Sequence, residues 1–182
     1  TVDKDYLFTV TQTMTNAGAS PVAARPYGVI SRSYGANTNY SMFQHNVDVD
    51  AWTMHVGPLG DFNQAVDFAT NYSDLDEAGA AGKRHNSKGG WIGFGDTYWL
   101  TALVPAANAS IDAGFRAGGG SYQADYAEPQ QIVAAGQSLK TTSRLFAGAK
   151  EVDLLNRYED AAGIARLGNS IDWGWFEIIE KP

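Results

Sequence analysis

Cysteine, histidine and long hydrophobic runs are absent or scarce in this sequence. None of the 182 residues is Cys, which excludes a disulfide scaffold, a thiolate metal site and a cysteine nucleophile. No segment offers the ~20 mostly apolar residues that a membrane-spanning helix needs. The longest uncharged stretch, residues 6–24, is full of Thr, Gln, Asn and Ser. We therefore expect a folded domain that is neither disulfide-rich nor itself embedded in a bilayer.

Basic residues are also few. The chain has 13 Lys and Arg against 20 Asp and Glu, and its net charge of −7 argues against a nucleic acid or an anionic membrane bound through a broad basic patch. With 44% hydrophobic and 12% aromatic residues the composition is that of one folded domain. The chain opens with Thr-Val-Asp-Lys-Asp, without Met or a signal peptide, and we expect a piece of a longer protein.

Alternation of apolar and polar side chains predicts a mainly β protein. Tyr6, Phe8, Val10 and Met14 share one face, which predicts a half-buried strand with threonines on its wet side. Turn signals recur every ten or so residues, about the spacing of an antiparallel sandwich. Further strands are expected at 22–34, 52–56, 65–69, 91–104 with a turn at Gly95-Asp96, 111–115, 122–126 and 138–146. The pair Gly57-Pro58 is expected to end a strand, and 72–87 to be a mobile loop.

The spacing becomes helical after residue 147. Apolar residues within 152–162 recur with the period of a helix, Asp153 is favourable in its first turn, and Gly163 is a stop signal. A second short helix is expected from Asn169 or Ser170 to Glu180. Because apolar residues nearly encircle it, this helix must be buried or lie at an interface. We therefore divide the chain into a β-sandwich portion, 1–148, and a C-terminal helical segment, 149–182.

No sequence motif supports a catalytic, metal or cofactor site. His45, His55 and His85 form no His-x-x-x-His pair, and a calcium loop counted from Asp74 would need a Glu where His85 stands. The Gly-rich runs lack the partners of a phosphate loop or a dinucleotide fingerprint, and no nucleophile elbow occurs. Asp48 and Asp50 alternate on a possible strand, for which outward, solvated carboxylates are the usual reason. We predict no cofactor and no metal.

The aromatic residues allow two interpretations. Trp91, Trp99, Tyr122 and Tyr126 are typical of the core between two sheets, although an aromatic strip on a sandwich can also stack on sugars. The pair of tryptophans at 173 and 175 faces roughly opposite ways on the expected helix. One ring can pack on the body while the other points toward a membrane–water boundary, or both can be buried.

Three segments identify a family resemblance. They are Gly-Gly-Trp-Ile-Gly-Phe-Gly-Asp-Thr-Tyr-Trp-Leu-Thr-Ala-Leu-Val-Pro at 89–105, Leu-Phe-Ala-Gly-Ala-Lys-Glu-Val-Asp-Leu-Leu at 145–155, and Ile-Asp-Trp-Gly-Trp-Phe at 171–176 followed by Lys181-Pro182. Together they resemble the YidC family of membrane-protein insertases, in its order and at about its spacing. The opening to Asn16 and the acidic run at 74–77 also fit, so the similarity covers nearly the whole chain.

The resemblance implies the large periplasmic domain of a Gram-negative inner-membrane protein, between its first and second membrane helices. The implied fold is a galactose-mutarotase-like β-supersandwich closed by C-terminal helices, without mutarotase chemistry. The implied role is a non-catalytic scaffold and docking surface for membrane-protein insertion. The implied partners are Sec translocon accessory subunits, nascent membrane proteins and the membrane surface near the C-terminus. The residues expected near partner or membrane are Leu154, Leu155, Tyr158, Trp173, Trp175 and Phe176.

The chain also departs from the family pattern. Thr97 stands where the family usually has a basic residue, and Glu177 and Glu180 would resist deep burial in lipid. The family's earlier sandwich strands, before Thr1, are missing. We therefore expect an open sheet edge or an uncovered apolar face.

Two rival functions remain open on the sequence. A carbohydrate-binding or aldose-epimerase-like sandwich protein would have an open cleft with exposed aromatic side chains and a His or carboxylate pair. A chaperone-like surface would hold an extended apolar peptide in a groove. Sugar titration and peptide binding would separate these from the insertase module.

Overall fold

The computed structural model describes residues 1–33 and 55–172, and this part of the chain is mainly β, as the alternation predicts. The larger of the two main sheets is antiparallel, with six strands in the order β1-β12-β8-β7-β4-β5. Their bounds in that order are Leu7–Thr15, Ser138–Ala149, Trp99–Val104, Trp91–Gly95, Gly57–Phe62 and Ala65–Asp67.

The smaller main sheet has four antiparallel strands in the order β3-β10-β9-β6, and a short pair, β11-β2, lies beyond it. The bounds of the four are Tyr27–Ser33, Ser121–Ala127, Ser110–Gly118 and Lys83–Lys88. Those of β11 and β2 are Gln131–Val133 and Val22–Ala24. The helices are α1 at Tyr72–Ala78, α2 at Val152–Ala162 and a 3₁₀ turn at Gly168–Ser170.

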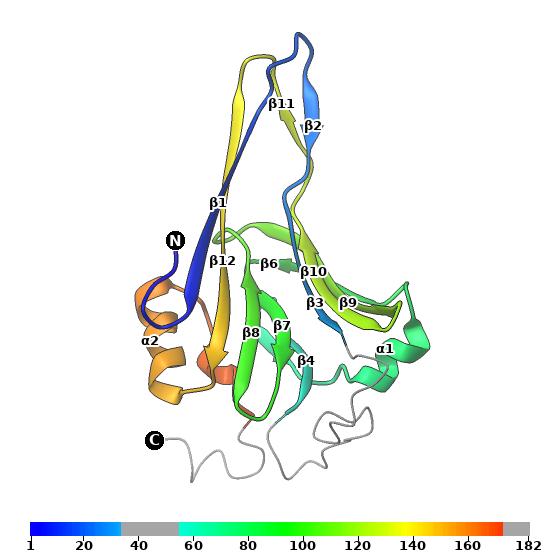
Figure 1. Ribbon diagram of the computed structural model, residues 1–182, viewed down its shortest axis with the longest axis vertical. Helices are drawn as coiled ribbons and strands as arrows, with labels where there is room; N and C mark the ends of the chain where they lie inside the picture. The colour runs from blue at the N-terminus through cyan, green and yellow to red at the C-terminus, as the bar shows by residue number, and fades with distance from the viewer. Residues whose placement is uncertain (34–54, 173–182) are drawn as a thin grey trace.

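The two faces of the large sheet bury different clusters, which gives three layers. On β7 and β8, Ile92, Phe94 and Leu103 belong to the cluster shared with the small sheet. Trp91, one position before Ile92, and Leu100, three positions before Leu103, belong to the cluster shared with α2, because side chains an odd number of positions apart on a strand point to opposite faces. Figure 1 shows the arrangement, with α2 on one side of the large sheet and the small sheet on the other. The predicted antiparallel sandwich with a C-terminal helix is confirmed.

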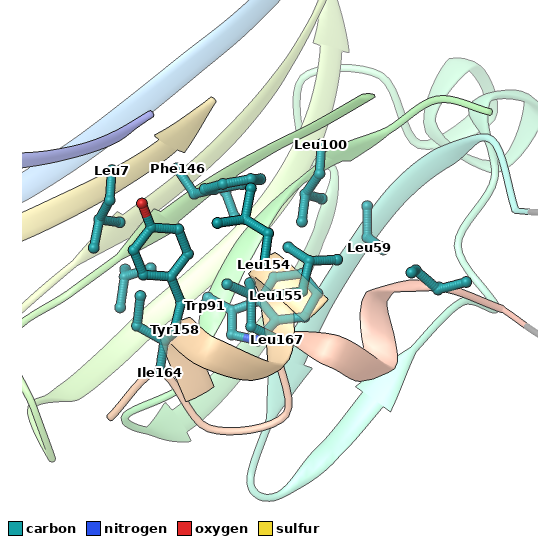
Figure 2. Packing of buried hydrophobic residues seen from close by; sticks show 13 residues of the cluster. Leu7, Leu59, Trp91, Leu100, Phe146, Leu154, Leu155, Tyr158, Ile164 and Leu167 are labelled. Carbon is teal, nitrogen blue, oxygen red and sulfur yellow. The ribbon is translucent and has the colours of Figure 1, made fainter. Parts of the chain in front are cut away.

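The cluster under α2 joins the sheet to the C-terminal segment. Leu154, Leu155 and Tyr158 of α2 point into the sheet, and Ile164 and Leu167 follow them from the next turns (Figure 2). The sheet contributes Leu7, Leu59, Trp91, Leu100, Ala102, Val104 and Phe146. This is a second hydrophobic core, separate from the one between the sheets.

The interpretation of residues 72–87 as a mobile loop is wrong. They form α1 and most of β6. Asn71 is the N-cap of the helix: its side chain accepts a hydrogen bond from the Asp74 backbone N–H, and the Asp74 carboxylate accepts one from the Asn71 backbone N–H. Leu75 is fully buried. Strand β6 pairs with β9 along its whole length. Both elements consist mostly of polar residues and bury few apolar side chains, so neither shows a clear pattern of apolar residues in the sequence.

The expectation that Gly57-Pro58 ends a strand is also wrong. Strand β4 begins at Gly57, and all six of its residues are buried. Pro58 is tolerated because β4 pairs only with β7 at that position, and pairing with β5 begins at Gly60. The strand expected at 52–56 falls mostly outside the described residues.

The half-buried face expected on β1 is exposed instead. Phe8, Val10 and Met14 are each more than a third exposed, whereas Leu7, on the other face, is buried against α2. Contacts between the sheets join β3 to β8, β10 to β7 and β6 to β4. The outer strands β12 and β1 extend away from this overlap (Figure 1). This side of β1 therefore carries three partly exposed apolar side chains.

Candidate functional site

Helix α2 is an amphipathic helix with a definite end. It runs from the N-cap Glu151 to Gly163, which adopts the left-handed conformation and donates its backbone N–H to the carbonyl of Tyr158. Asp153 lies in the first turn, where a negative charge is favourable. The predicted helix and its glycine stop are confirmed, and the expected helix from Asn169 or Ser170 lies mostly outside the described residues.

The N-terminal segment is held against α2. The hydroxyl of Tyr158 donates to Oδ2 of Asp3 at 2.6 Å, and Nη2 of Arg157 donates to Oδ2 of Asp5 at 2.6 Å. Burial and the Asp3 carboxylate both raise the pKa of Tyr158 well above its ordinary value. Burial works against ionisation of Asp3, but hydrogen bonds from Tyr158 and from backbone N–H groups lower its pKa overall.

The loop after α2 is fixed to the large sheet by a buried ion pair. Nε and Nη2 of Arg166 donate to the two carboxylate oxygens of Asp61 at 3.0 and 2.7 Å, and the Asp61 side chain has no exposed surface. The hydrogen bond that Arg166 donates to Asp61 raises the pKa of Arg166. The indole Nε1 of Trp91 donates to the carbonyl of Ala165 at 3.2 Å. Arg144 donates to the carbonyl of Ala162, so the helix end is held at several points.

The junction between β12 and α2 carries a half-buried lysine. Nζ of Lys150 donates to the carbonyl of His55 at 3.4 Å. Burial lowers the pKa of Lys150 to about 8, although the charges of Asp96 and Asp172 oppose this shift. Nε2 of His55 lies 2.9 Å from the carbonyl of Pro58, and burial lowers the pKa of His55. These contacts join the ends of three strands to the start of the C-terminal segment.

The predicted partner-contacting residues divide into two groups. Leu154, Leu155 and Tyr158 are at most 6% exposed, because the large sheet covers them. Trp173, Trp175 and Phe176 lie outside the described residues. The surface that α2 presents to solvent is the opposite one, which we call the outer face: Asp153, Asn156, Arg157 and Asp160. The sequence prediction selected the apolar residues of α2, which are buried, and did not identify the exposed outer face.

Tyr122 and Tyr126 lie in the core between the two sheets, as one of the two interpretations predicts, whereas Trp91 lies in the second core under α2. Trp91, Tyr122 and Tyr126 are buried, but Trp99 is 62% exposed. Trp99 borders a hollow of about 320 Å³ between β3 and β8. The hollow is lined by Ile30, Ser31, Arg32, Phe94, Asp96, Trp99 and Thr101. Its charged groups are an ion pair, with Arg32 Nη2 3.3 Å from Asp96 Oδ2.

The described histidines do not form a recognisable reaction centre. The His85 ring stacks on Phe62 with centroids 4.2 Å apart, and its Nε2 lies 3.7 Å from Asp67, beyond hydrogen-bond distance. Burial lowers the pKa of His85. Within residues 1–33 and 55–172, no group of three or more His, Cys, Asp or Glu residues is placed to hold a metal ion. His45, Asp48 and Asp50 lie outside the described residues.

Comparison with known proteins decides the family. The profile of the YidC periplasmic domain matches residues 1–182. The chain belongs to this family. It is 43% identical over 182 residues to the membrane protein insertase YidC of Zymomonas mobilis, covering 99% of this chain and 30% of that relative. It is 38% identical over 186 residues to the insertase YidC of Rickettsia typhi, covering 100% of this chain and 31% of the relative.

The chain thus spans less than a third of the length of these curated relatives. It corresponds to the periplasmic domain of a bacterial inner-membrane YidC protein. Among the described residues, no helix combines the length and the hydropathy needed to cross a bilayer.

Proposed function

We propose that this YidC periplasmic domain is a non-catalytic scaffold and docking surface for membrane-protein insertion. In this proposal the sandwich portion, 1–148, is the rigid body and the helical segment, 149–182, couples it to the membrane. The observation that carries the proposal is the dual character of α2. Its apolar side is fixed to the large sheet by the second core, while its outer face is exposed to solvent.

The partners in this proposal are Sec translocon accessory subunits and nascent membrane proteins. The outer face carries the carboxylates of Asp153 and Asp160 beside the single guanidinium of Arg157. That guanidinium is already paired with Asp5. The net negative charge favours a partner segment with Lys or Arg side chains, because complementary charge speeds association and rejects wrong partners.

Deleting residues 150–182 would be a poor test. It would remove Leu154, Leu155 and Tyr158 from the second core and leave Trp91 and Phe146 uncovered. Loss of function in that variant would report misfolding as readily as a missing docking surface.

Charge reversal of the outer face separates the two effects. In the full-length protein, Asp153→Lys with Asp160→Lys should reduce insertion of a dependent membrane protein several-fold, while loss of the favourable first-turn charge lowers the thermal midpoint of the isolated chain by no more than about 4 °C. The matched control is Glu77→Lys, an exposed carboxylate on α1. Insertion would be followed in cells depleted of their own insertase. Wild-type insertion by the double variant would remove the docking role from this face.

A sugar-handling function has one observation in its favour, the exposed Trp99 beside the hollow between β3 and β8. The hollow is bordered by the Arg32–Asp96 ion pair and by neither described histidine. We expect titration with mono- and oligosaccharides to leave tryptophan emission unchanged. A saturable change that Trp99→Phe abolishes would favour the sugar-binding alternative.

A further inference from the structure

The turn between β7 and β8 presents two adjacent aromatic side chains to solvent. Tyr98 is 71% exposed and Trp99 is 62% exposed, whereas Trp91 on the preceding strand is fully buried. Neither ring belongs to the two hydrophobic cores. Two exposed aromatic side chains that are adjacent in the sequence can form a binding patch.

This turn is rigid. The backbone N–H of Asp96 donates to the carbonyl of Trp99 at 2.7 Å, and the N–H of Lys150 donates to the carbonyl of Tyr98 at 2.9 Å. The Asp96 carboxylate accepts from the N–H of Thr97 at 2.8 Å and from Arg32 at 3.3 Å. A preorganised turn loses little conformational entropy when its side chains bind, which favours association.

The turn lies near the last described residues of the chain. Its carbonyl at Tyr98 is bonded to Lys150, the residue just before α2. The Lys150 ammonium interacts with both Asp96 of the turn and Asp172, the last described residue. Figure 1 shows the β7–β8 turn at the lower end of the large sheet, where the described chain also ends. The sequence then continues with Trp173-Gly174-Trp175-Phe176.

We propose that Tyr98 and Trp99 form a lipid contact, in which the β7–β8 turn rests its two rings in the headgroup region of the bilayer. This inference deepens the scaffold role proposed above and rests on it. Tyr and Trp suit that region because each has an apolar ring and a polar group that stays hydrated. The nearby charges are compatible, since Arg32 pairs with the Asp96 carboxylate.

The size of the patch favours lipid over a protein partner. An aromatic side chain buries at most about 250 Å², so two of them offer no more than about 500 Å². A stable protein interface needs roughly 800 Å² from each partner. A small projecting aromatic pair on a domain that is tethered to a membrane needs only modest affinity, because the tether supplies a high local concentration.

The test places a fluorescent probe at the turn in the full-length protein. An environment-sensitive fluorescent amino acid would replace Tyr98, and the protein would be reconstituted in vesicles of phosphatidylethanolamine and phosphatidylcholine. Matched controls carry the same probe at Tyr27 on β3 or at Ile132 on β11, each 66% exposed. Thermal unfolding of the corresponding isolated chains would verify that each substitution leaves the fold intact.

Lipid contact predicts a blue-shifted emission at position 98 and several-fold quenching by lipids brominated on the acyl chain, with neither effect at 27 or 132. An unquenched probe at 98 would overturn the proposal, and so would equal quenching at all three positions. A blue shift without bromine quenching would assign the turn to a protein partner and also overturn it. If the probe at position 98 shows neither a blue shift nor quenching, while the α2 charge-reversal variant loses insertion as expected, the lipid contact is refuted and the docking role of α2 is kept.

Discussion

At the scale of single residues, the polar groups that matter most are those that the second core encloses. Asp61 is fully buried, and its charge is balanced by Arg166 from the loop after α2, more than a hundred residues along the chain. A buried charge that loses its partner is strongly destabilising, whereas replacing both partners with apolar residues is often tolerated. The Asp61–Arg166 pair therefore fixes the position of the loop after α2 against the large sheet.

Arg166→Met should lower the free energy of unfolding by about 3–5 kcal/mol, because it leaves the Asp61 carboxylate buried and unpaired. The double variant Asp61→Leu with Arg166→Met should recover a large part of that loss. Urea unfolding of the 182-residue chain measures both. An Arg166→Met variant as stable as wild type would contradict the account of this pair.

Lys150 should give stability a characteristic dependence on pH. Its pKa is about 8 in the folded chain and 10.5 ordinarily, so unfolding takes up a proton between those values and stability rises with pH there. Below pH 8 the folded state bears the full cost of the half-buried charge, which can reach about 3 kcal/mol. Lys150→Met should be more stable than wild type at pH 7, and the difference should shrink toward pH 10. Thermal unfolding across this range would show no such convergence if the amine were freely solvated.

At the scale of elements, α2 has two kinds of contact that mutation can separate. Leu155 is fully buried in the second core, and Leu155→Ala should cost about 2–5 kcal/mol through the cavity it leaves. Tyr158→Phe keeps the ring, which packs edge-on against Phe146, and removes only the hydroxyl that donates to Asp3. A loss of about 1 kcal/mol is expected for that hydrogen bond. Equal losses in urea unfolding would refute this division.

The elements that sequence patterns predicted well are those with a strong local signal. The β7–β8 hairpin has a Gly95-Asp96 turn between two apolar runs, and α2 has an apolar stripe with a glycine stop. By contrast, β4 is buried on both faces and carries Gly and Pro, so it has no alternation to detect. Strand β6 is polar because it pairs with a single neighbour, β9, at the edge of the small sheet.

The candidate site was only partly predictable for a similar reason. The sequence identified α2 and its apolar residues, but it could not show that the large sheet covers them. The ion pair of Asp61 with Arg166 and the bond from Tyr158 to Asp3 join positions far apart in the chain, and no local pattern encodes such pairs. The outer face became visible only once the buried side of the helix was known.

At the scale of the whole molecule, two cores on opposite faces of one sheet give a body that holds α2 in a fixed orientation. The first core joins the two sheets, and the second joins the large sheet to the C-terminal segment. A partner bound to the outer face of α2 would therefore be held in a fixed position relative to the whole sandwich. A scaffold needs such a fixed position.

Photo-crosslinking from the outer face of α2 tests the docking role of this helix most directly. A photoreactive amino acid would replace Asp160 in the full-length protein in living cells, with Glu77 on α1 as the control position. We predict crosslinks from position 160 to Sec accessory subunits or to membrane proteins under insertion, and none from position 77. Equal crosslinking from both positions, or none from position 160, would contradict the claim that this helix is the docking surface.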